Sequence, residues 1–395
     1  MIITITLPLR KRQSRQPGNK PSSARAKLAP SNLRPHVKAP DRAQHWIPLK
    51  TGTSSALDHP VLRELEQKAL FHSLKDNKAV GSALRKYHIW ADLFNIPERE
   101  RFPASFQLIY SFGIWAVSTR SDVQQDFVFE PVTKKTAMNY LDAINNYHTM
   151  HHLPRPMGEE QRKRIEFALK GIARLSPNRR RPPRPPVKLS HLHALRQAFD
   201  ISDQFDAACY AAALSAFFGL ARLGELTVPS VTSFDSKIHA TVNDLVFGSD
   251  QAGRNYAKIN LPAAKTDDPN STEMQSLYLT CQQNTLNPLE ALRNHRRINA
   301  APDNASLFAY RTSDGDFRPL TKSAFLNRLQ SVWEAAGIVG LFGHSFRIGG
   351  ASFFLAKGVS VEMVRLLGRW RSIAFELYLR AFEEIAPQHL QNVAA

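Results

Sequence analysis

The stretch GHSFRIGGASFFLAKGVSVEMVRLLGRWRSIAFELYLR, residues 343–380, is the part of the chain from which we interpret the rest. His344 and Arg347 lie three positions apart, so a helix that begins at the first residue of this stretch carries both on one face. Gly358 is expected to end that helix, because glycine adopts the left-handed conformation of a helix C-terminus without steric cost. Ser360 is placed to cap the next helix.

The remainder of the stretch adds an aromatic ring and a phenol. An apolar run, residues 361–367, leads to Arg369 and Trp370, and Ser372 can cap a last helix that carries Tyr378. Polar and aromatic side chains therefore arrive on successive short helices. Such a layout can aim all of them at a single phosphate group.

The order of these residues resembles that of the tyrosine recombinases, the phage-integrase family, in which H-x-x-R precedes a Gly, a His or Trp, and a nucleophilic Tyr. The form GHSFRIGG…GRWRS…Y looks most like recombinase-like proteins of fungal mobile elements such as Cryptons. Trp370 lies 23 residues after Arg347 and 8 before Tyr378. Counting back by the nine-residue spacing of other members reaches Arg369 instead. We favour Trp370 for the His/Trp position, because the shorter spacing also occurs in the fungal relatives, and Arg369 stays open as the alternative.

This resemblance implies a fold that is mainly α with a small antiparallel β-sheet. It also implies two domains, an all-α core-binding (SAM-like) domain and an α+β catalytic domain. We expect a basic, mostly disordered tail at residues 1–58 and a helical DNA-binding domain at 59–175. An Arg/Pro-rich linker at 176–188 then leads to the catalytic domain at 189–395.

Composition agrees with a nucleic-acid partner. The 395 residues suit two domains, and 52 Lys and Arg against 34 Asp and Glu give a net charge of +18. A chain this basic suits a polyanion. Its two cysteines, Cys209 and Cys281, favour a reducing compartment, and no run reaches the ~18 apolar residues that a membrane span requires.

The N-terminal tail is the most basic part of the chain. Residues 1–58 contain eleven Lys or Arg and two Asp or Glu, are rich in Pro, Ser and Gln, and lack periodicity, which indicates disorder. The cluster Arg10, Lys11 and Arg12 can serve as a nuclear import signal. We therefore expect a nuclear protein if the chain comes from a fungal or other eukaryotic mobile element, and a cytoplasmic one otherwise.

Hydrophobic periodicity predicts four or five helices between residues 60 and 175. Asp58 is expected to cap the first helix, with Pro60 in its first turn. Further helices are expected at 80–94, 106–118, 133–148 and 159–175. Lys134 and Lys135 are candidate phosphate contacts. The cluster of His148, His151 and His152 lacks a Cys or carboxylate at ligand spacing, so we expect no metal site.

The segment SPNRRRPPRPP, residues 176–186, is the clearest boundary. Its prolines favour an extended polyproline conformation, and four arginines coat it with positive charge, namely Arg179, Arg180, Arg181 and Arg184. We expect this linker to follow a DNA backbone. A plain spacer is the compatible alternative.

After the linker, residues 189–199 and 205–218 are expected to form helices, the second one buried. Arg222 and Glu225 follow, three positions apart. The resemblance implies that Arg222 is the first catalytic arginine and that the carboxylate of Glu225 orients it. A structural ion pair is the alternative.

Three alternating runs, 239–247, 255–262 and 274–280, predict a small antiparallel sheet. The resemblance implies that a lysine of this sheet enters the minor groove. Lys265 is the first candidate and Lys258 the second. Beyond the sheet, a helix is expected to start at Asn287–Pro288. Another helix is expected at 321–337, with five core-facing residues, Phe325, Leu329, Val332, Trp333 and Ala336.

Transfer of a phosphoryl group explains the choice of residue types. Two guanidinium groups, Arg222 and Arg347, can neutralise the charge that develops on the non-bridging oxygens. Tyr378 is a nucleophile whose phenol has an ordinary pKa of about 10, so cations that favour loss of its proton help the attack. His344 can accept or shuttle that proton, since imidazole titrates near neutrality.

Two further groups complete the expected site. Lys265 would protonate the departing 5′ oxygen, and the indole N–H of Trp370 would donate to a phosphate oxygen. One phosphodiester is exchanged for a phosphotyrosine ester of similar energy, so we expect no cofactor. The expected partners are double-stranded DNA and further copies of the chain, in a tetramer on paired sites. Two alternatives stay open: a type IB topoisomerase-like activity and a domesticated, non-catalytic DNA-binding protein.

Overall fold

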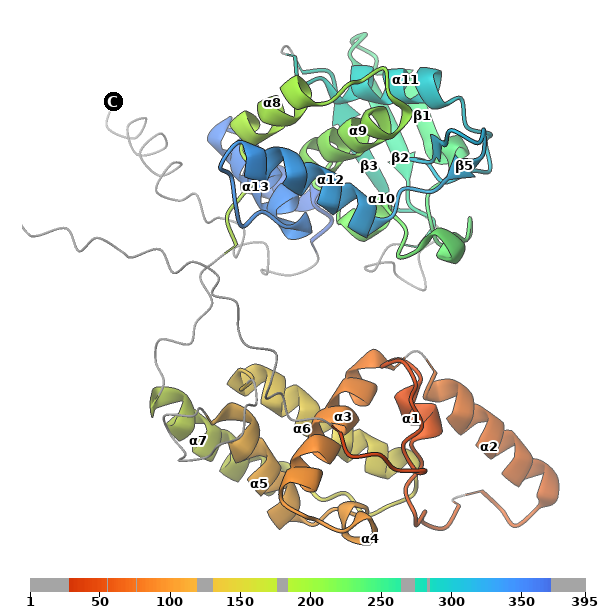
Figure 1. Ribbon diagram of the computed structural model, residues 1–395, viewed down its shortest axis with the longest axis vertical. Helices are drawn as coiled ribbons and strands as arrows, with labels where there is room; N and C mark the ends of the chain where they lie inside the picture. Colours follow the sequence, from red (N-terminus) through yellow and green to blue (C-terminus); the bar gives the residue numbers. More distant parts are fainter. Residues whose placement is uncertain are drawn as a thin grey trace, which may run out of the picture. The chain divides into compact units, whose positions relative to one another are not determined.

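The computed structural model divides the chain into two compact units, Met1–Arg181 and Pro182–Ala395 (Figure 1). The structure describes residues 28–54, 56–75, 77–118, 131–175, 184–263, 274–282 and 285–370. In these residues the first unit is all helical, whereas the second combines helices with a small antiparallel sheet. The predicted fold class is therefore confirmed. The boundary between the units falls within the predicted linker at 176–188.

The helices of the first unit begin where short polar side chains cap them. Asn77, Ser105 and Thr133 accept hydrogen bonds from backbone N–H groups of the first turns that follow them. The helices are α1 (Arg42–His45), α2 (Pro60–Ser73), α3 (Lys78–Leu93), α4 (Glu98–Arg101), α5 (Phe106–Val117), α6 (Lys134–Met150) and α7 (Glu159–Leu175). The predicted cap of α2 is wrong by one residue. His59 is the N-cap, because Pro60 sets the start of the helix, and Asp58 instead pairs with Arg63 at 2.6 Å.

Apolar side chains at helical spacing form the core of this unit. Helix α3 packs against α6, and α5 packs against α6 and α7. Leu84, Ile109, Leu141, Ile144 and Leu169 are at most 1% exposed. Burial of this face, rather than helix propensity, holds the helices together.

The predicted disorder of residues 1–58 is wrong for the part from residue 28 onward that the structure describes. Ala43 and Trp46 belong to the hydrophobic core, and the Trp46 indole N–H donates to the carbonyl of Pro35 at 2.9 Å. Arg34 is buried and bonds to His88. Its buried apolar residues do not recur at a helical spacing, and Ile47 and Leu49 are exposed, so a periodicity argument cannot detect this segment.

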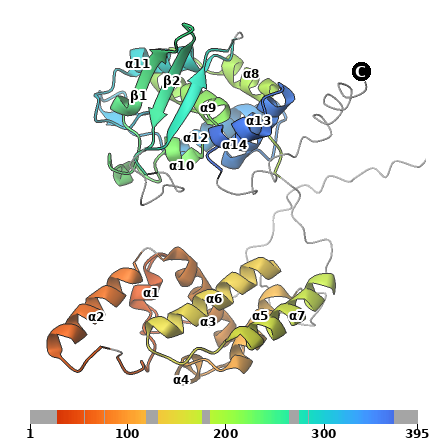
Figure 2. The same ribbon diagram turned by 180° about the vertical axis from the view of Figure 1, so that it is seen from behind.

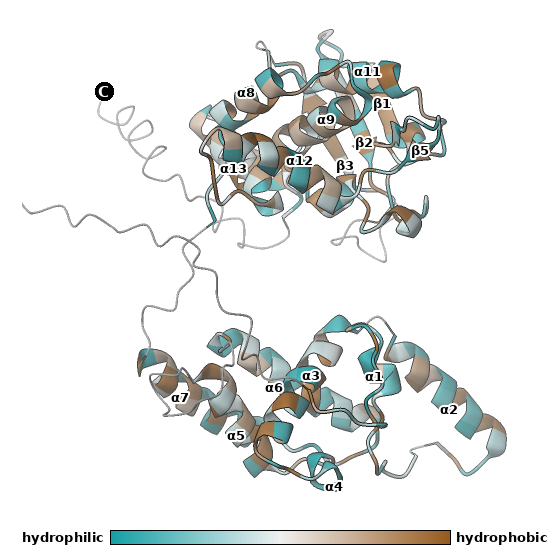
Figure 3. Ribbon diagram, in the orientation of Figure 1, coloured by the Kyte–Doolittle hydropathy of each residue, from teal (hydrophilic) through white to brown (hydrophobic). Residues whose placement is uncertain are grey.

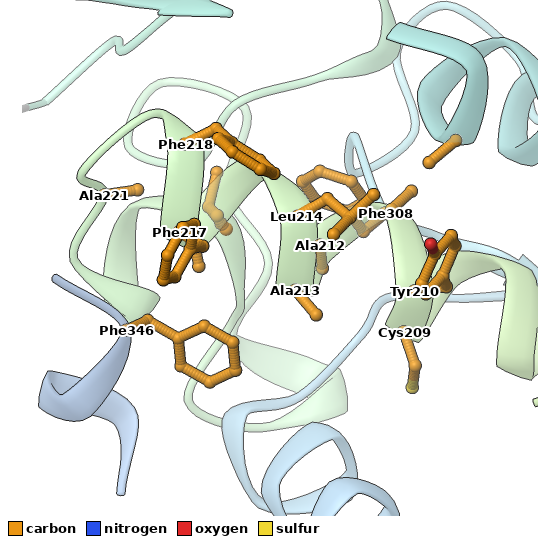
Figure 4. Close-up of a cluster of buried hydrophobic side chains, with 14 of the residues drawn as sticks. Cys209, Tyr210, Ala212, Ala213, Leu214, Phe217, Phe218, Ala221, Phe308 and Phe346 are labelled. Atoms are coloured by element: carbon orange, nitrogen blue, oxygen red, sulfur yellow. The ribbon is translucent and has the colours of Figure 1, made fainter. Parts of the chain in front are cut away.

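The second unit is built around one buried helix. Every residue of α9 (Gln204–Phe218) from Asp206 onward is buried, and Figure 4 shows its side chains in the core with Phe308 and Phe346. The other helices are α8 (Leu189–Ala198), α10 (Leu223–Leu226), α11 (Pro288–Asn299), α12 (Lys322–Ala335), α13 (Gly343–Ala356) and α14 (Val361–Leu367). Figure 3 colours the same elements by hydropathy and shows brown apolar and teal hydrophilic residues mixed along most helices of this unit.

The sheet of the second unit has the order β1 (Leu245–Ser249), β2 (Asn255–Asn260), β3 (Ser276–Thr280), all antiparallel (Figure 2). Leu245, Ile259 and Leu277 lie opposite one another and face the core. Lys258 is on the other face, because successive side chains of a strand alternate. The predicted first strand began six residues too early, since residues 242–244 form a 3₁₀ turn.

A second hairpin, β4 (Tyr310–Arg311) with β5 (Phe317–Arg318), was not predicted, because strands of two residues are too short to show alternation. The cap predicted for α14, Ser360, is confirmed, and α11 starts at the predicted position, with Asn287 as its N-cap. In α12, four of the five predicted core residues are buried. Ala336 is exposed, because it is the C-cap residue beyond the last buried turn.

Candidate active site

Two adjacent glycines set the position of helix α13, which carries His344 and Arg347. A Cβ atom on Gly349 would lie 1.9 Å from the carbonyl oxygen of Val187, and one on Gly350 would lie 2.1 Å from that of Phe217. Only glycine allows backbones to approach this closely. The pair in GHSFRIGG therefore lets α13 pack directly on the end of α9, where the segment with Arg222 begins.

Glu225 brings together Arg222, three residues before it, and Arg369, 144 residues after it. The Arg222 guanidinium donates to Glu225 Oε1 at 2.8 Å, and the Arg369 guanidinium donates to Glu225 Oε2 at 2.7 Å. The backbone N–H of Arg222 also donates to Glu225 Oε2, at 2.8 Å. The carboxylate of Glu225 is 7% exposed and thus orients both cations from a buried position.

Arg347 is the third arginine of this region and the most buried, at 1% exposure. One of its Nη atoms donates to the carbonyl of Leu220 at 2.6 Å, and the other donates to the carbonyl of Gly368. The ring of Trp370 covers it, with 4.4 Å from Cζ to the ring centroid. Arg347 therefore connects the segment before Arg222 to the turn that carries Arg369 and Trp370.

We call Arg222, Glu225, Arg347 and Arg369 the arginine cluster. It contains three guanidinium groups and one carboxylate, so its formal charge is positive by two. Burial lowers the pKa of Arg369, the Glu225 carboxylate opposes this decrease, and the neighbouring Arg222 adds to it. A buried group with excess positive charge favours a bound anion.

The structure places several other predicted site residues. His344 is half-buried in the first turn of α13, three residues before Arg347. Lys135 and Arg184 are exposed, whereas Lys134 and Lys258 are half-buried. A larger set lies outside the described residues, namely Lys265, Tyr378, Arg179, Arg180 and Arg181.

The sequence named Arg369 but not its ion pair with Glu225. Arg222 and Glu225 are neighbours on one turn, so their contact is predictable from spacing, whereas Arg369 reaches Glu225 only through tertiary structure. The carbonyls of Leu220 and Gly368 that bind Arg347 were also missed. Backbone groups leave no signal in a sequence.

Within the histidine cluster, both ring nitrogens of His148 have structural partners. His148 accepts from the backbone N–H of Ala104 at 2.8 Å and is hydrogen-bonded to the carbonyl of Ile144. Burial lowers its pKa. Among the described residues, no group of three or more His, Cys, Asp or Glu is arranged to hold a metal ion.

The solved structures that this chain resembles are tyrosine recombinases and integrases. XerH site-specific recombinase bound to its difH substrate, in a post-cleavage complex, is 14% identical, with a TM-score of 0.49 over 84% of this chain and 83% of that one. A transposon integrase in complex with transposon right-end DNA is 12% identical, with a TM-score of 0.47 over 84% and 99%. A lambda integrase tetramer bound to a Holliday junction is 12% identical, with a TM-score of 0.42 over 82% of each chain.

No protein-family model matches the sequence, and neither does any curated protein. The likeness to fungal mobile elements stays a prediction. In the part of the chain that the structure describes, no helix is both long and apolar enough to cross a membrane.

Proposed function

We propose that this chain breaks and rejoins DNA at specific sites through a covalent 3′-phosphotyrosyl intermediate. The observation that carries the proposal is the arginine cluster, in which the Arg222 and Arg369 guanidinium groups share the Glu225 carboxylate and the Arg347 guanidinium donates to backbone carbonyls. A phosphodiester carries one negative charge and gains more during attack, so it suits a site with excess positive charge. The resemblance of the motif order to tyrosine recombinases supports a tyrosine nucleophile and a phosphotyrosyl intermediate.

Arg222 and Arg347 hold the non-bridging oxygens of the scissile phosphate. Arg222 is 28% exposed and kept in place by Glu225, so it meets the phosphate first. The Trp370 ring lies over Arg347, and the carbonyls of Leu220 and Gly368 fix the direction of its guanidinium group. Both arginines neutralise charge on the phosphorus centre without changing their own protonation.

The Tyr378 oxygen attacks phosphorus, and the bond from phosphorus to the 5′ oxygen breaks. His344 takes the phenolic proton, and Lys265 gives a proton to the departing 5′ oxygen. Rejoining is the reverse step, in which a 5′-hydroxyl attacks the phosphotyrosine. Because one ester replaces another of similar energy, the reaction proceeds without a cofactor.

Basic side chains outside the site contribute the attraction to double-stranded DNA. Lys134 and Lys135 on α6 belong to this group, with the linker residues Arg179, Arg180, Arg181 and Arg184. Contacts of this kind bind phosphates without regard to sequence and weaken with salt. In the proposed reaction, four copies of the chain pair two sites within a mobile element. The nucleus is the compartment if the host is eukaryotic, and the cytoplasm otherwise.

A suicide substrate tests this proposal. A library of duplexes with a nick beside a randomised core loses its short cleaved fragment, so a covalent protein–DNA adduct accumulates. The wild-type chain is expected to form an adduct that survives denaturant, and Tyr378→Phe is expected to form none. Sequencing the trapped DNA then identifies the target.

Two other outcomes decide between the alternatives. Tight, salt-sensitive binding without any adduct would identify a domesticated DNA-binding protein. Relaxation of a supercoiled plasmid that lacks the trapped site would identify a topoisomerase-like activity.

A further inference from the structure

Arg369 has an unused hydrogen-bond donor at the arginine cluster. Its side chain is 7% exposed, one Nη donates to Glu225 Oε2, and the other donates to the carbonyl of Leu367 at 3.1 Å. Its Nε–H is buried and meets no acceptor among the described residues. A buried donor without an acceptor is costly, so this group favours a ligand with an oxygen.

The backbone of Arg369 is arranged to direct its side chain inward. Its φ is 54°, in the left-handed region that few residues other than glycine adopt. Backbone hydrogen bonds from Arg369 to Leu366, at 2.9 Å, and from Trp370 to Arg365, at 3.1 Å, hold this turn. Strained conformations of this kind concentrate where a side chain must reach a functional site.

The same turn places the Trp370 ring in packing contacts. A Cβ atom on Gly368 would lie 1.8 Å from the Trp370 ring, so the indole covers that glycine directly. The ring also covers Arg347. In this turn the Arg369 guanidinium therefore lies against the Glu225 carboxylate, whereas the Trp370 ring lies over Arg347.

We propose that Arg369, rather than Trp370, contacts the scissile phosphate, with its Nε–H donating to a non-bridging oxygen. This inference rests on the proposed function and deepens it, since it assigns the position that the sequence left open between these two residues. Arg369 then acts as a third phosphate-binding arginine. The phosphate supplies both the missing acceptor and the missing negative charge.

Inorganic phosphate is the probe for this inference, measured by calorimetric titration of the full chain. Arg369→Lys keeps a cation for Glu225 but removes the Nε–H. We expect this variant to weaken phosphate binding about 10-fold, the usual effect of losing a charge-assisted hydrogen bond. Arg365→Lys, an exposed arginine on α14, is the matched control and should stay within about 2-fold of the wild type.

A second measurement remains informative if Arg369→Lys unfolds. The Nε–H resonance of Arg369 in the wild-type chain should move downfield when phosphate is added, because a new hydrogen bond forms. An unchanged resonance, or equal phosphate affinity in the wild type and Arg369→Lys, would overturn the inference. Loss of phosphate binding in Trp370→Phe but not in Arg369→Lys would also overturn it.

The phosphate-binding experiment and the suicide-substrate experiment can fail independently of each other. Phosphate binding that depends on Arg369, together with no covalent adduct on DNA, would retain the anion site and reject the strand-transfer reaction. A covalent adduct with phosphate binding independent of Arg369 would retain the reaction and reject this assignment.

Discussion

Each unit contains a buried group of charged side chains, and the two groups differ in their charge balance. In the first unit, Arg34 and Arg101 face Asp92 and Glu98, with 2.7 Å between Arg101 and Asp92. His88 lies 3.1 Å from Arg34 and 3.2 Å from Arg101. Two cations therefore meet two anions around one imidazole.

Burial, followed by the two nearby arginines, holds the pKa of His88 well below its usual range, so the imidazole is neutral. The arginine cluster of the second unit instead has three cations and one anion. Arg34 also has a buried Nε without an acceptor among the described residues, so an unused donor alone does not mark a ligand site. The excess charge distinguishes the second cluster, which we interpret as functional, from the first, which we interpret as structural.

The largest expected effect is on catalysis. Arg222→Gln should slow DNA cleavage by about 10²–10³-fold, because it removes a donor to the transition state. Suicide-substrate kinetics measure this rate. Arg328→Gln is the matched control, since Arg328 pairs with Asp206 through two bonds of 2.7 Å in a balanced pair of the same unit. Arg328→Gln should lose stability and keep its cleavage rate. Equal slowing of cleavage in both variants would contradict a specific role of the arginine cluster.

Removal of the only carboxylate of the arginine cluster should be nearly as severe. We expect Glu225→Ala to lower the free energy of unfolding by about 3–4 kcal/mol, because it leaves buried cations uncompensated. Inorganic phosphate should restore part of this loss. Chemical denaturation with and without phosphate, at equal ionic strength, measures both effects.

The first unit provides the contrast for that experiment. Arg101→Leu should also cost about 3 kcal/mol, because it leaves two largely buried carboxylates with Arg34 as their one cation in this group. Phosphate should bring no recovery, since the excess charge is then negative. Recovery of both variants by phosphate would show that the anion acts non-specifically.

Close packing of α13 is needed by the arginine cluster and not by the first-unit group. Gly349→Ala should cost about 2–3 kcal/mol, because the new methyl group meets the carbonyl of Val187. Gly171→Ala is the control, since a Cβ at that position meets nothing within 4 Å and a helix interior favours alanine. Thermal unfolding compares the two, and equal melting temperatures would contradict the packing account.

The smallest expected effect is on the pH dependence of the first unit. The folded-state pKa of His88 is below its unfolded value, so its contribution to stability is complete above about pH 6.5 and is lost as pH falls. His88→Asn should reduce the loss of stability between pH 6.5 and 5 by up to about 2 kcal/mol. Burial also lowers the pKa values of His148 and His151, so these residues add to the loss of stability at low pH. Urea denaturation at each pH therefore compares the wild type with His88→Asn, and the difference between their free energies of unfolding isolates His88.

Local rules predicted much of the fold. The helices expected from Thr133, Asn287 and Thr321 begin there, with these residues as N-caps, and the continuous apolar run of α9 predicted its burial. Each of these signals lies within one element, so a sequence displays it directly. The segment from residue 28 to 58 gave no such signal, because its contacts are with distant helices.

The same division applies to the candidate site. Spacing predicted the pair of Arg222 and Glu225 and the shared helix of His344 and Arg347. It could not predict that Arg369 binds Glu225 or that the carbonyl of Leu220 binds Arg347, since both contacts depend on how α13 and α14 pack. The positive φ of Arg369 likewise appears only in three dimensions.

Mass spectrometry of the trapped protein–DNA adduct tests the central claim most directly. After nuclease and protease digestion, the account predicts a single modified peptide that carries a nucleotide on the Tyr378 oxygen through a 3′-phosphate. A nucleotide on any other side chain, or a 5′-phosphate linkage, would contradict it.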